Sequence, residues 1–322
     1  MFKNRRAFLR SAAVAAAGFG STAVAQTQKP QGPPAGQPGQ PAQAAAPPQL
    51  ASEIQVPKMR FGKVEISRLI VGCNPFYGFA HYNNILGTVM REYYTAERVC
   101  EVLHQCNRFG INTYNYVQLG RAPQDLQRFI AEGGKMHLIV QGTGDPDTVY
   151  RMFKPHAIYY HGEQTDRAYQ DGKMDAVKEW CKKTRDLGVM VGVGSHKPEV
   201  LAKVEEEGWD VDFYAGCVYN RTRTDDEWRK VLNGELPEMS REIYLQSDPP
   251  RMYKFMKQTS KPCFAFKIMA AGRITARGAD QAFRAAYESI KPIDGVFIGM
   301  FPRMQDEVRE NAERVHKILA GA

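Results

Sequence analysis

The chain has 322 residues, of which 43% are hydrophobic, and a formal net charge of +8. This length is enough for one (β/α)8 barrel or for two smaller domains. Residues 1–25 hold four basic residues and no acid, so the rest of the chain carries 8 − 4 = +4. Because its basic residues are interleaved with acids, the sequence predicts no nucleic-acid-binding face.

Residues 1–25 are typical of an export signal that is not part of the fold. Arg5-Arg6 is followed by Phe8-Leu9, by a modestly apolar run, Ser11–Val24, and by a small-residue cleavage site, Ala23–Ala25. This order resembles a twin-arginine signal, with a Sec signal or a short membrane anchor as the alternatives. The run is too short to span a bilayer core of roughly 30 Å. We therefore expect the twin-arginine export machinery as a partner, a periplasmic or secreted location, and no stable membrane span.

Residues 26–50 predict a disordered tether, because they are mostly Pro, Gln, Ala and Gly and show no apolar period. The predicted barrel domain is then residues 51–322, in which no internal linker is evident. This part holds all six cysteines. Cys73, Cys217 and Cys263 lie in or at the ends of apolar segments, where cysteine is usually a small buried hydrophobe. We therefore expect no disulfide framework.

From residue 68 onward, short apolar segments alternate with helical patterns. The predicted strands are 68–73, 111–116, 137–141, 156–161, 189–193, 211–217, 263–268 and 295–299. The predicted helices are 95–109, 123–131, one that begins near 146, 175–187, 199–207, one that begins near 247, 278–290 and 305–319. Strands that alternate with helices indicate a parallel sheet, and eight of them favour closure into a single (β/α)8 TIM barrel of the α/β class. No GxGxxG turn opens a helix, which argues against a Rossmann fold.

Several segments, taken in chain order, resemble the aldo/keto reductase superfamily. They are Arg60–Lys63 with Ile66–Leu69, Gly110–Asn115, Ser195–Val200, Asp212–Asn220 and Glu310-Asn311. A closer resemblance is to an uncharacterised branch of twin-arginine-exported barrel proteins. It rests on Asn74–His81, Tyr160–Gly162, Ala265–Gly272 and Gly299–Phe301. The resemblance implies an aldo/keto reductase-like barrel, and the closer branch implies no particular reaction.

The resemblance also implies a catalytic set of Asp, Tyr, Lys and His, from which this chain departs. Asn115 stands in place of the Asp, Gly120 lies near the Tyr position, and Gln141 ends the strand that would carry the Lys. Only His161 matches. Without a Tyr–Lys pair the chain lacks the tuned proton donor that hydride reduction of a carbonyl requires.

The alternative is a divergent NADP(H)-dependent oxidoreductase. The resemblance implies that the segment after the last strand anchors the adenosine phosphate of the cofactor. In this chain that segment reads Phe301-Pro302-Arg303. Arg303 and Asn311 are the residues that would hold the dinucleotide.

Polar, uncharged side chains follow several of the predicted strands. The candidate substrate-binding residues are Asn74, Asn115, Gln141, Tyr219 and Asn220. Because the C-terminal ends of barrel strands meet at one mouth, we expect these side chains to bind a single substrate there. Amides and hydroxyls suit a ligand with many hydroxyl groups better than an anion, so the predicted substrate is a small sugar-like carbonyl compound.

Three residues near two neighbouring strand ends predict a divalent metal site. His161 and Glu163 are two apart, and His196 follows the next strand. Adjacent strands lie only about 4.8 Å apart, so two imidazoles and a carboxylate could converge on one cation that activates water or polarises a carbonyl. The alternative is that His196 caps the following helix while Glu163 is a solvated loop acid.

Lys267 is the second candidate catalytic residue, beside His161. It follows Phe264-Ala265-Phe266, and a free ammonium is costly to bury in such a strand. Lowering of its pKa would let it act as a base or form a Schiff base with a carbonyl. The alternatives are a structural ion pair with Glu163 or a substrate clamp. With His161 as the partner acid or base, we expect an isomerase, epimerase or lyase.

Two loops are predicted to border the mouth. Residues 221–246, after the sixth strand, form a lid or rim. An aromatic group after the first strand, Phe76, Tyr77, Phe79 and Tyr82, forms either a sugar-stacking platform or a plug. Stacking alone would suit a third class, a non-catalytic carbohydrate-binding protein.

Overall fold

The structure is a computed structural model that describes residues 52–236 and 242–321. All of these residues belong to one compact unit. The predicted signal, 1–25, and the predicted tether, 26–50, lie outside the described residues. No described helix is both long and apolar enough to cross a bilayer.

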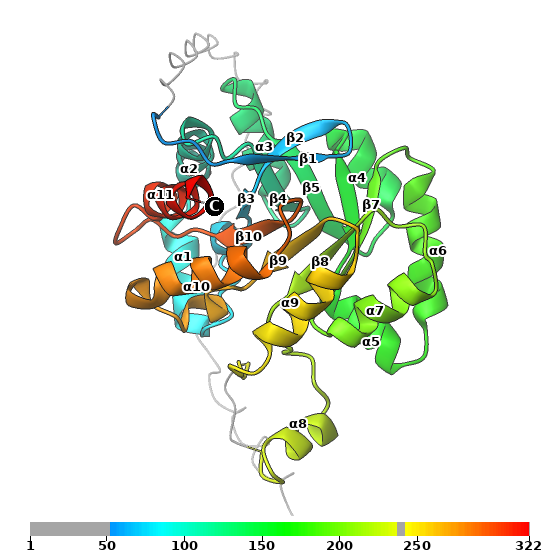
Figure 1. Cartoon of the computed structure of the whole chain (residues 1–322). Coiled ribbons are helices and arrows are strands. Elements are labelled where there is room, and N and C mark those ends of the chain that lie inside the picture. Colours follow the sequence, from blue (N-terminus) through cyan, green and yellow to red (C-terminus); the bar gives the residue numbers. More distant parts are fainter. Residues whose placement is uncertain (1–51, 237–241, 322) are drawn as a thin grey trace, which may run out of the picture. The chain divides into compact units, whose positions relative to one another are not determined.

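Eight parallel strands close into a barrel, as predicted (Figure 1). In the order in which they pair, β10 is followed by β3 through β9. Their bounds are β3 Leu69–Gly72, β4 Thr113–Val117, β5 His137–Gly142, β6 Ala157–Tyr160, β7 Met190–Ser195, β8 Phe213–Cys217, β9 Cys263–Phe266 and β10 Gly295–Gly299. Each overlaps the strand expected from its apolar run, which confirms the predicted fold class.

The eight predicted helices are also present. They are α2 Ala96–Arg108, α3 Ala122–Ala131, α4 Pro146–Phe153, α6 Met174–Arg185, α7 Pro198–Glu206, α9 Pro249–Gln258, α10 Ala276–Ser289 and α11 Glu307–Ala320. Their starts follow local chemistry. Thr95 caps α2 by accepting a hydrogen bond from Arg98 N, and α4 and α7 begin with proline, which needs no N–H partner there.

Several short elements were not predicted. They are the hairpin strands β1 Lys58–Phe61 and β2 Val64–Ser67, the 3-10 helices η1 Asn74–Tyr77 and η2 Ala270–Gly272, and the helices α1 Asn84–Tyr93, α5 Gly162–Gln170 and α8 Asp225–Val231. The segment after β3 is thus largely helical rather than loop, because the Asn83 side chain caps α1 through Leu86 N at 2.7 Å.

The hairpin of β1 and β2 closes the floor of the barrel. Phe61 is fully buried, and its ring packs edge-on against Phe213 and Phe264 at 5.3 and 5.2 Å between centroids. Phe264 in turn stacks on Phe297 at 4.8 Å. This aromatic filling leaves the C-terminal end of the strands as the place where a substrate can enter.

All six cysteines are buried and free. Cys100 and Cys106 lie on α2, Cys181 lies on α6, and the other three lie at or near strands, as expected. Burial raises the pKa of Cys73 and Cys181 to about 12. They therefore act as small apolar side chains of the core.

We predict that Phe61→Ala lowers the free energy of unfolding by about 3–5 kcal/mol, because it leaves a cavity at the barrel floor. Urea unfolding followed by tryptophan fluorescence measures the effect. Ile293→Ala is the control: Ile293 is 40% exposed, and its truncation should cost no more than about 0.5 kcal/mol. Equal losses in the two variants would contradict the role of the hairpin as a plug.

Candidate functional site

Lys267 lies at the mouth of the barrel, directly after β9. Its φ of 63° is left-handed, and Ala270 and Ala271 nearby also have positive φ, at 48° and 53°. Residues other than glycine rarely adopt this conformation, and such outliers collect at functional sites. Because of this turn, the Lys267 side chain does not continue the alternating side-chain directions of β9. Its Nζ lies 3.2 Å from His81 Nε2.

His81 connects Lys267 to Glu242. Its Nδ1 lies 2.8 Å from Glu242 Oε1, and its Nε2 also lies 3.4 Å from Asn74 Nδ2. A carboxylate only accepts hydrogen bonds, so Nδ1 carries the proton and Nε2 is the acceptor. Lys267 and Asn74 therefore donate to Nε2. Burial, reinforced by the charge of Lys267, lowers the pKa of His81 to about 4 despite Glu242.

Glu242 holds three further groups around itself. Arg221 Nη2 approaches its Oε1 at 2.6 Å, Tyr244 donates to Oε2 at 2.7 Å, and Arg273 donates to its carbonyl oxygen at 2.7 Å. Burial opposes ionisation of this carboxyl, but the hydrogen bonds from His81 and Arg221 outweigh it and hold the pKa of Glu242 well below its usual range. Glu242 is therefore a carboxylate.

The ammonium of Lys267 is destabilised. Burial is the largest cause, and the charge of Arg221 adds to it, while Cys217, Glu242 and Glu163 act in the opposite direction; the net effect lowers the pKa of Lys267. Among the described residues, no carboxylate lies within ion-pair distance of Nζ. The lysine is thus closer to a free amine than a surface lysine is.

His161 occupies the N-terminal position of α5, directly after β6. Its Nδ1 is buried and has no hydrogen-bond partner within the described part of the chain. Burial, aided by the nearby His196, lowers the pKa of His161 to about 4. The residue lines a cavity of about 520 Å³ together with Gln141, Thr143 and Trp180. His161 is therefore neutral at pH 7 and has an unused nitrogen.

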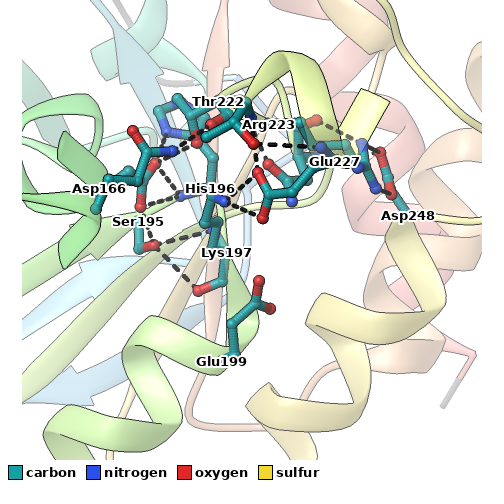
Figure 2. A network of polar contacts seen from close by, with 12 residues as sticks. Asp166, Ser195, His196, Lys197, Glu199, Thr222, Arg223, Glu227 and Asp248 are labelled. Atoms are coloured by element: carbon teal, nitrogen blue, oxygen red, sulfur yellow. Dashed lines mark hydrogen bonds and ion pairs between the residues drawn. The ribbon is translucent and has the colours of Figure 1, made fainter. Parts of the chain in front are cut away.

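His196 forms a dyad with Asp166 of α5 (Figure 2). Nδ1 lies 2.8 Å from Asp166 Oδ2, and the same carboxylate accepts from the hydroxyls of Ser195 and Thr222 and from the His196 backbone N–H. Burial lowers the pKa of His196, and Asp166 partly offsets it. Because Asp166 occupies Nδ1, Nε2 is the nitrogen left for a ligand.

The expected metal site does not fit this geometry. Glu163 pairs with Arg221 Nη1 at 2.9 Å, and His196 is committed to Asp166. Within residues 52–236 and 242–321, no group of three or more His, Cys, Asp or Glu side chains is placed to hold a metal ion. The two alternatives also need correction: Glu163 is ion-paired, and α7 has Lys197 at its N-cap without a side-chain cap bond.

Two of the expected substrate residues share a partner inside the barrel. Tyr159 Oη lies 3.0 Å from Gln141 Oε1 and 3.2 Å from Asn115 Oδ1. A hydroxyl has one proton, so one of these amides accepts it and the other presents its NH2 group. With Asn74 beside His81, three of the five expected residues lie in the mouth.

Tyr219 and Asn220 instead anchor the start of the segment that follows β8. Tyr219 packs on Tyr244 at 5.0 Å, and Asn220 N donates to Asp248. Figure 2 shows Arg223 on the same carboxylate of Asp248. Tyr219 and Asn220 are both buried, and neither lines the cavity beside His161.

An ion pair with a buried lysine holds the segment that follows β8 at a later point in the chain. Lys197 is only 2% exposed, and its Nζ lies 2.6 Å from Glu227 Oε1 (Figure 2). Glu227 also completes a capping box with Thr224 at the start of α8. The segment expected to form a lid or rim is therefore tied to β7 before it reaches Glu242.

The two residues expected to hold a dinucleotide differ in their exposure to solvent. Arg303 is exposed in the loop after β10, whereas Asn311 is buried and its Oδ1 accepts from Arg314 at 3.0 Å. Asn311 thus already has a structural partner.

The expected aromatic group divides into two parts. Phe76 is buried and packs on Tyr94 at 4.9 Å, and the half-buried Tyr77 packs against the same core, so both belong to it. Phe79 and Tyr82 are exposed, and Arg273 lies over the Tyr82 ring at 5.6 Å. Only the second pair is available for stacking.

Four residues of this arrangement were not predicted from the sequence: His81, Glu242, Arg221 and Asp166. His81 ends the resembling segment Asn74–His81, which was a usable signal. Glu242 lies 161 residues from His81, and Asp166 lies 30 residues from His196. Such pairs carry no local spacing from which they could be found.

No family model matches this chain, and no curated protein matches it. Solved structures do. A truncated 3-deoxy-D-arabino-heptulosonate 7-phosphate synthase from Thermotoga maritima is 14% identical, with a TM-score of 0.51, over 84% of this chain and 93% of that one. A phospho-2-dehydro-3-deoxyheptonate aldolase from Thermotoga maritima is 13% identical, with a TM-score of 0.49, over 85% and 77%. An uncharacterized B. cereus protein is 12% identical, with a TM-score of 0.43, over 78% and 63%. The likeness to the first of these shows a shared barrel fold alone, and the resemblance to aldo/keto reductases stays a prediction.

The lowered pKa values of His81 and His161 predict an acid-sensitive fold. Between about pH 4 and the ordinary pKa near 6.5, the unfolded chain binds protons that the folded chain does not, so the free energy of unfolding falls as the pH falls. In wild type, we expect His161 to account for about 1–2 kcal/mol of the loss between pH 7 and pH 5.

Urea unfolding of His161→Gln at both pH values should show a correspondingly smaller loss. His316→Gln, on α11, serves as the control and should retain the wild-type dependence. An unchanged pH dependence in His161→Gln would contradict the burial of a neutral imidazole.

Proposed function

We propose that this protein is a barrel enzyme that acts on a small sugar-like carbonyl compound, as a lyase or isomerase, through a Schiff base on Lys267. The observation that carries the proposal is the chain of contacts Lys267–His81–Glu242 at the mouth. It joins a lysine of lowered pKa to an imidazole whose acceptor nitrogen faces the amine.

The first step needs a free amine and a proton relay. The Lys267 nitrogen attacks the carbonyl carbon, and the resulting carbinolamine loses water to give an iminium ion. His81 Nε2 accepts a proton from the attacking nitrogen and returns one to the departing hydroxyl. Glu242 stabilises the imidazolium that exists between these transfers.

The iminium ion then draws electrons from the adjacent bonds. Loss of a proton from the neighbouring carbon gives an enamine, which leads to isomerisation or epimerisation. Loss of a proton from a β-hydroxyl breaks the carbon–carbon bond, which is the lyase outcome. His161 and the Asp166–His196 dyad are the neutral imidazoles that supply the base.

The cavity of about 520 Å³ beside His161 does not have Lys267 among its lining residues, so it would hold the hydroxyl-bearing end of a substrate whose carbonyl reacts at Lys267. Amide and hydroxyl groups line it, from Gln118, Gln141, Thr143, Thr148 and Gln164. No lysine or arginine is among the described residues that line it. A free sugar-like chain therefore fits this cavity better than a phosphorylated one.

A divergent NADP(H)-dependent aldo/keto oxidoreductase is less well supported. Asn115 and Gln141 occupy the positions expected for Asp and Lys and share the neutral Tyr159, and Asn311 is bonded to Arg314. NADPH retained by the purified protein, seen as blue-shifted fluorescence, would favour the oxidoreductase instead.

The export signal supports action outside the cytoplasm. Residues 1–25 lie outside the described part of the chain, so we propose the periplasmic or secreted location on the sequence alone.

A non-catalytic carbohydrate-binding protein is the third candidate, and it draws support only from the exposed pair Phe79 and Tyr82.

We predict that cyanoborohydride with dihydroxyacetone or glyceraldehyde modifies Lys267 at least about tenfold faster than the exposed Lys257, because burial lowers the pKa of Lys267 and His81 is placed to relay the proton. Peptide mass spectrometry locates the adducts, and Lys267→Met should lose the fast one. Equal rates at the two lysines, or no adduct on Lys267, would overturn the Schiff-base proposal.

We predict that His81→Gln slows formation of the Lys267 adduct by about 10²-fold, because the proton relay is lost. His104→Gln is the matched control, since His104 also pairs with a glutamate, Glu132 at 3.0 Å, but lies on α2. Its adduct should form at the wild-type rate. An unaltered rate in His81→Gln would remove His81 from the mechanism.

A further inference from the structure

A second cavity, of about 600 Å³, lies at the opposite end of the barrel from Lys267. It is bordered by the starts of β5 and β7, the residue before β6, the residue before β8, and the turn of the β1–β2 hairpin. Helices α3 and α4 form its outer wall; both are labelled in Figure 1 near the hairpin. Its volume falls within the range of small-molecule sites, about 300–1,000 Å³.

The outer wall of this cavity is apolar. On α3, Ile130 is exposed beside the cavity while Leu126 and Phe129 are buried beneath it, and Tyr150 and Phe153 of α4 are half-buried. Ile130 is 52% exposed, which is unusual for a large aliphatic side chain beside a hollow. Such a wall suits a flat or aliphatic body that would otherwise expose its surface to water.

The rim of the cavity carries a positive excess. Lys63, Lys154 and Arg185 line it, against one acid, Asp212. Asp212 Oδ2 is already engaged by Arg185 at 2.7 Å and by Val191 N at 2.7 Å. Lys63 and Lys154 are exposed and form no ion pair with a described residue. An anion would therefore meet two ammonium groups that have no carboxylate partner, of which that of Lys154 lies over the Tyr150 ring at 4.3 Å.

Two imidazoles complete the polar side. The rings of His137 and His156 lie 6.1 Å apart. His156 Nε2 donates to Phe61 O at 2.9 Å, whereas the His137 ring makes no hydrogen bond to any residue in the described ranges. Burial, with His156 and Lys58 acting in the same direction, lowers the pKa of His137. At pH 7 the neutral ring still has one N–H to donate.

We propose that this cavity at the barrel floor binds a small amphipathic carboxylate, with its apolar body against α3 and α4 and its head between Lys63, Lys154 and His137. The site is independent of the chemistry at Lys267. It combines an apolar wall with a few convergent donors, which is the usual composition of a ligand pocket. A neutral ligand would leave the two ammonium groups uncompensated.

The test is calorimetric titration of the full-length protein with 4-phenylbutyrate, and with 4-phenylbutan-1-ol as its uncharged counterpart. Wild type should bind the carboxylate saturably and at least about tenfold more tightly than the alcohol. The double variant Lys63→Gln, Lys154→Asn should lose about tenfold in affinity for the carboxylate, the sum of two exposed ion pairs. Asparagine is chosen because Lys154 has a φ of 46°, which asparagine tolerates.

Two controls assign the site. Lys254→Gln, Lys257→Gln removes the same charge from exposed positions of α9 and should keep the affinity within about twofold, as should Lys267→Met, which alters only the mouth. No saturable binding at about 10 mM, equal binding of the alcohol, or an equal loss in either control would overturn the proposal.

Discussion

The carboxylate of Glu242 organises the mouth of this barrel. It orients His81, draws in Arg221 and Tyr244, and so connects the segment after β8 to the loop after β3. Three groups, His81, Arg221 and Tyr244, contact this one carboxylate and stabilise its buried negative charge. Without it, His81 would lose the tautomer that turns Nε2 toward Lys267, and Arg221 would be left as a buried cation with only Glu163.

The cations of the mouth explain why its imidazoles are uncharged. Lys267 and Arg221 both act on His81, His161 and His196, in the same direction as burial. Burial is the largest cause, and a protonated imidazole would also add a positive charge beside the Arg221 guanidinium. The pocket therefore keeps three nitrogen bases in their reactive form while the carboxylates of Glu242 and Asp166 remain ionised.

The barrel was predictable because each strand is a short apolar run followed by a helical pattern, and both signals are local. Lys267 was predictable for a related reason: a charged lysine directly after the apolar strand Phe264-Ala265-Phe266 is unusual. The groups linked to it by contacts were not, because His81 lies 186 residues away and Glu242 belongs to an irregular segment. The described residues do not form the metal site predicted at His161, Glu163 and His196, because Arg221 pairs with Glu163 and Asp166 with His196, which sequence spacing could not show.

The six buried cysteines have a consequence for handling the protein. None forms a crosslink, and their thiols sit among side chains of the core. The folded barrel thus depends on packing and not on the oxidation state of its surroundings. The same tertiary structure should form in a glutathione-rich host and persist in an oxidising medium. Recombinant production therefore needs neither a disulfide isomerase nor a redox refolding buffer.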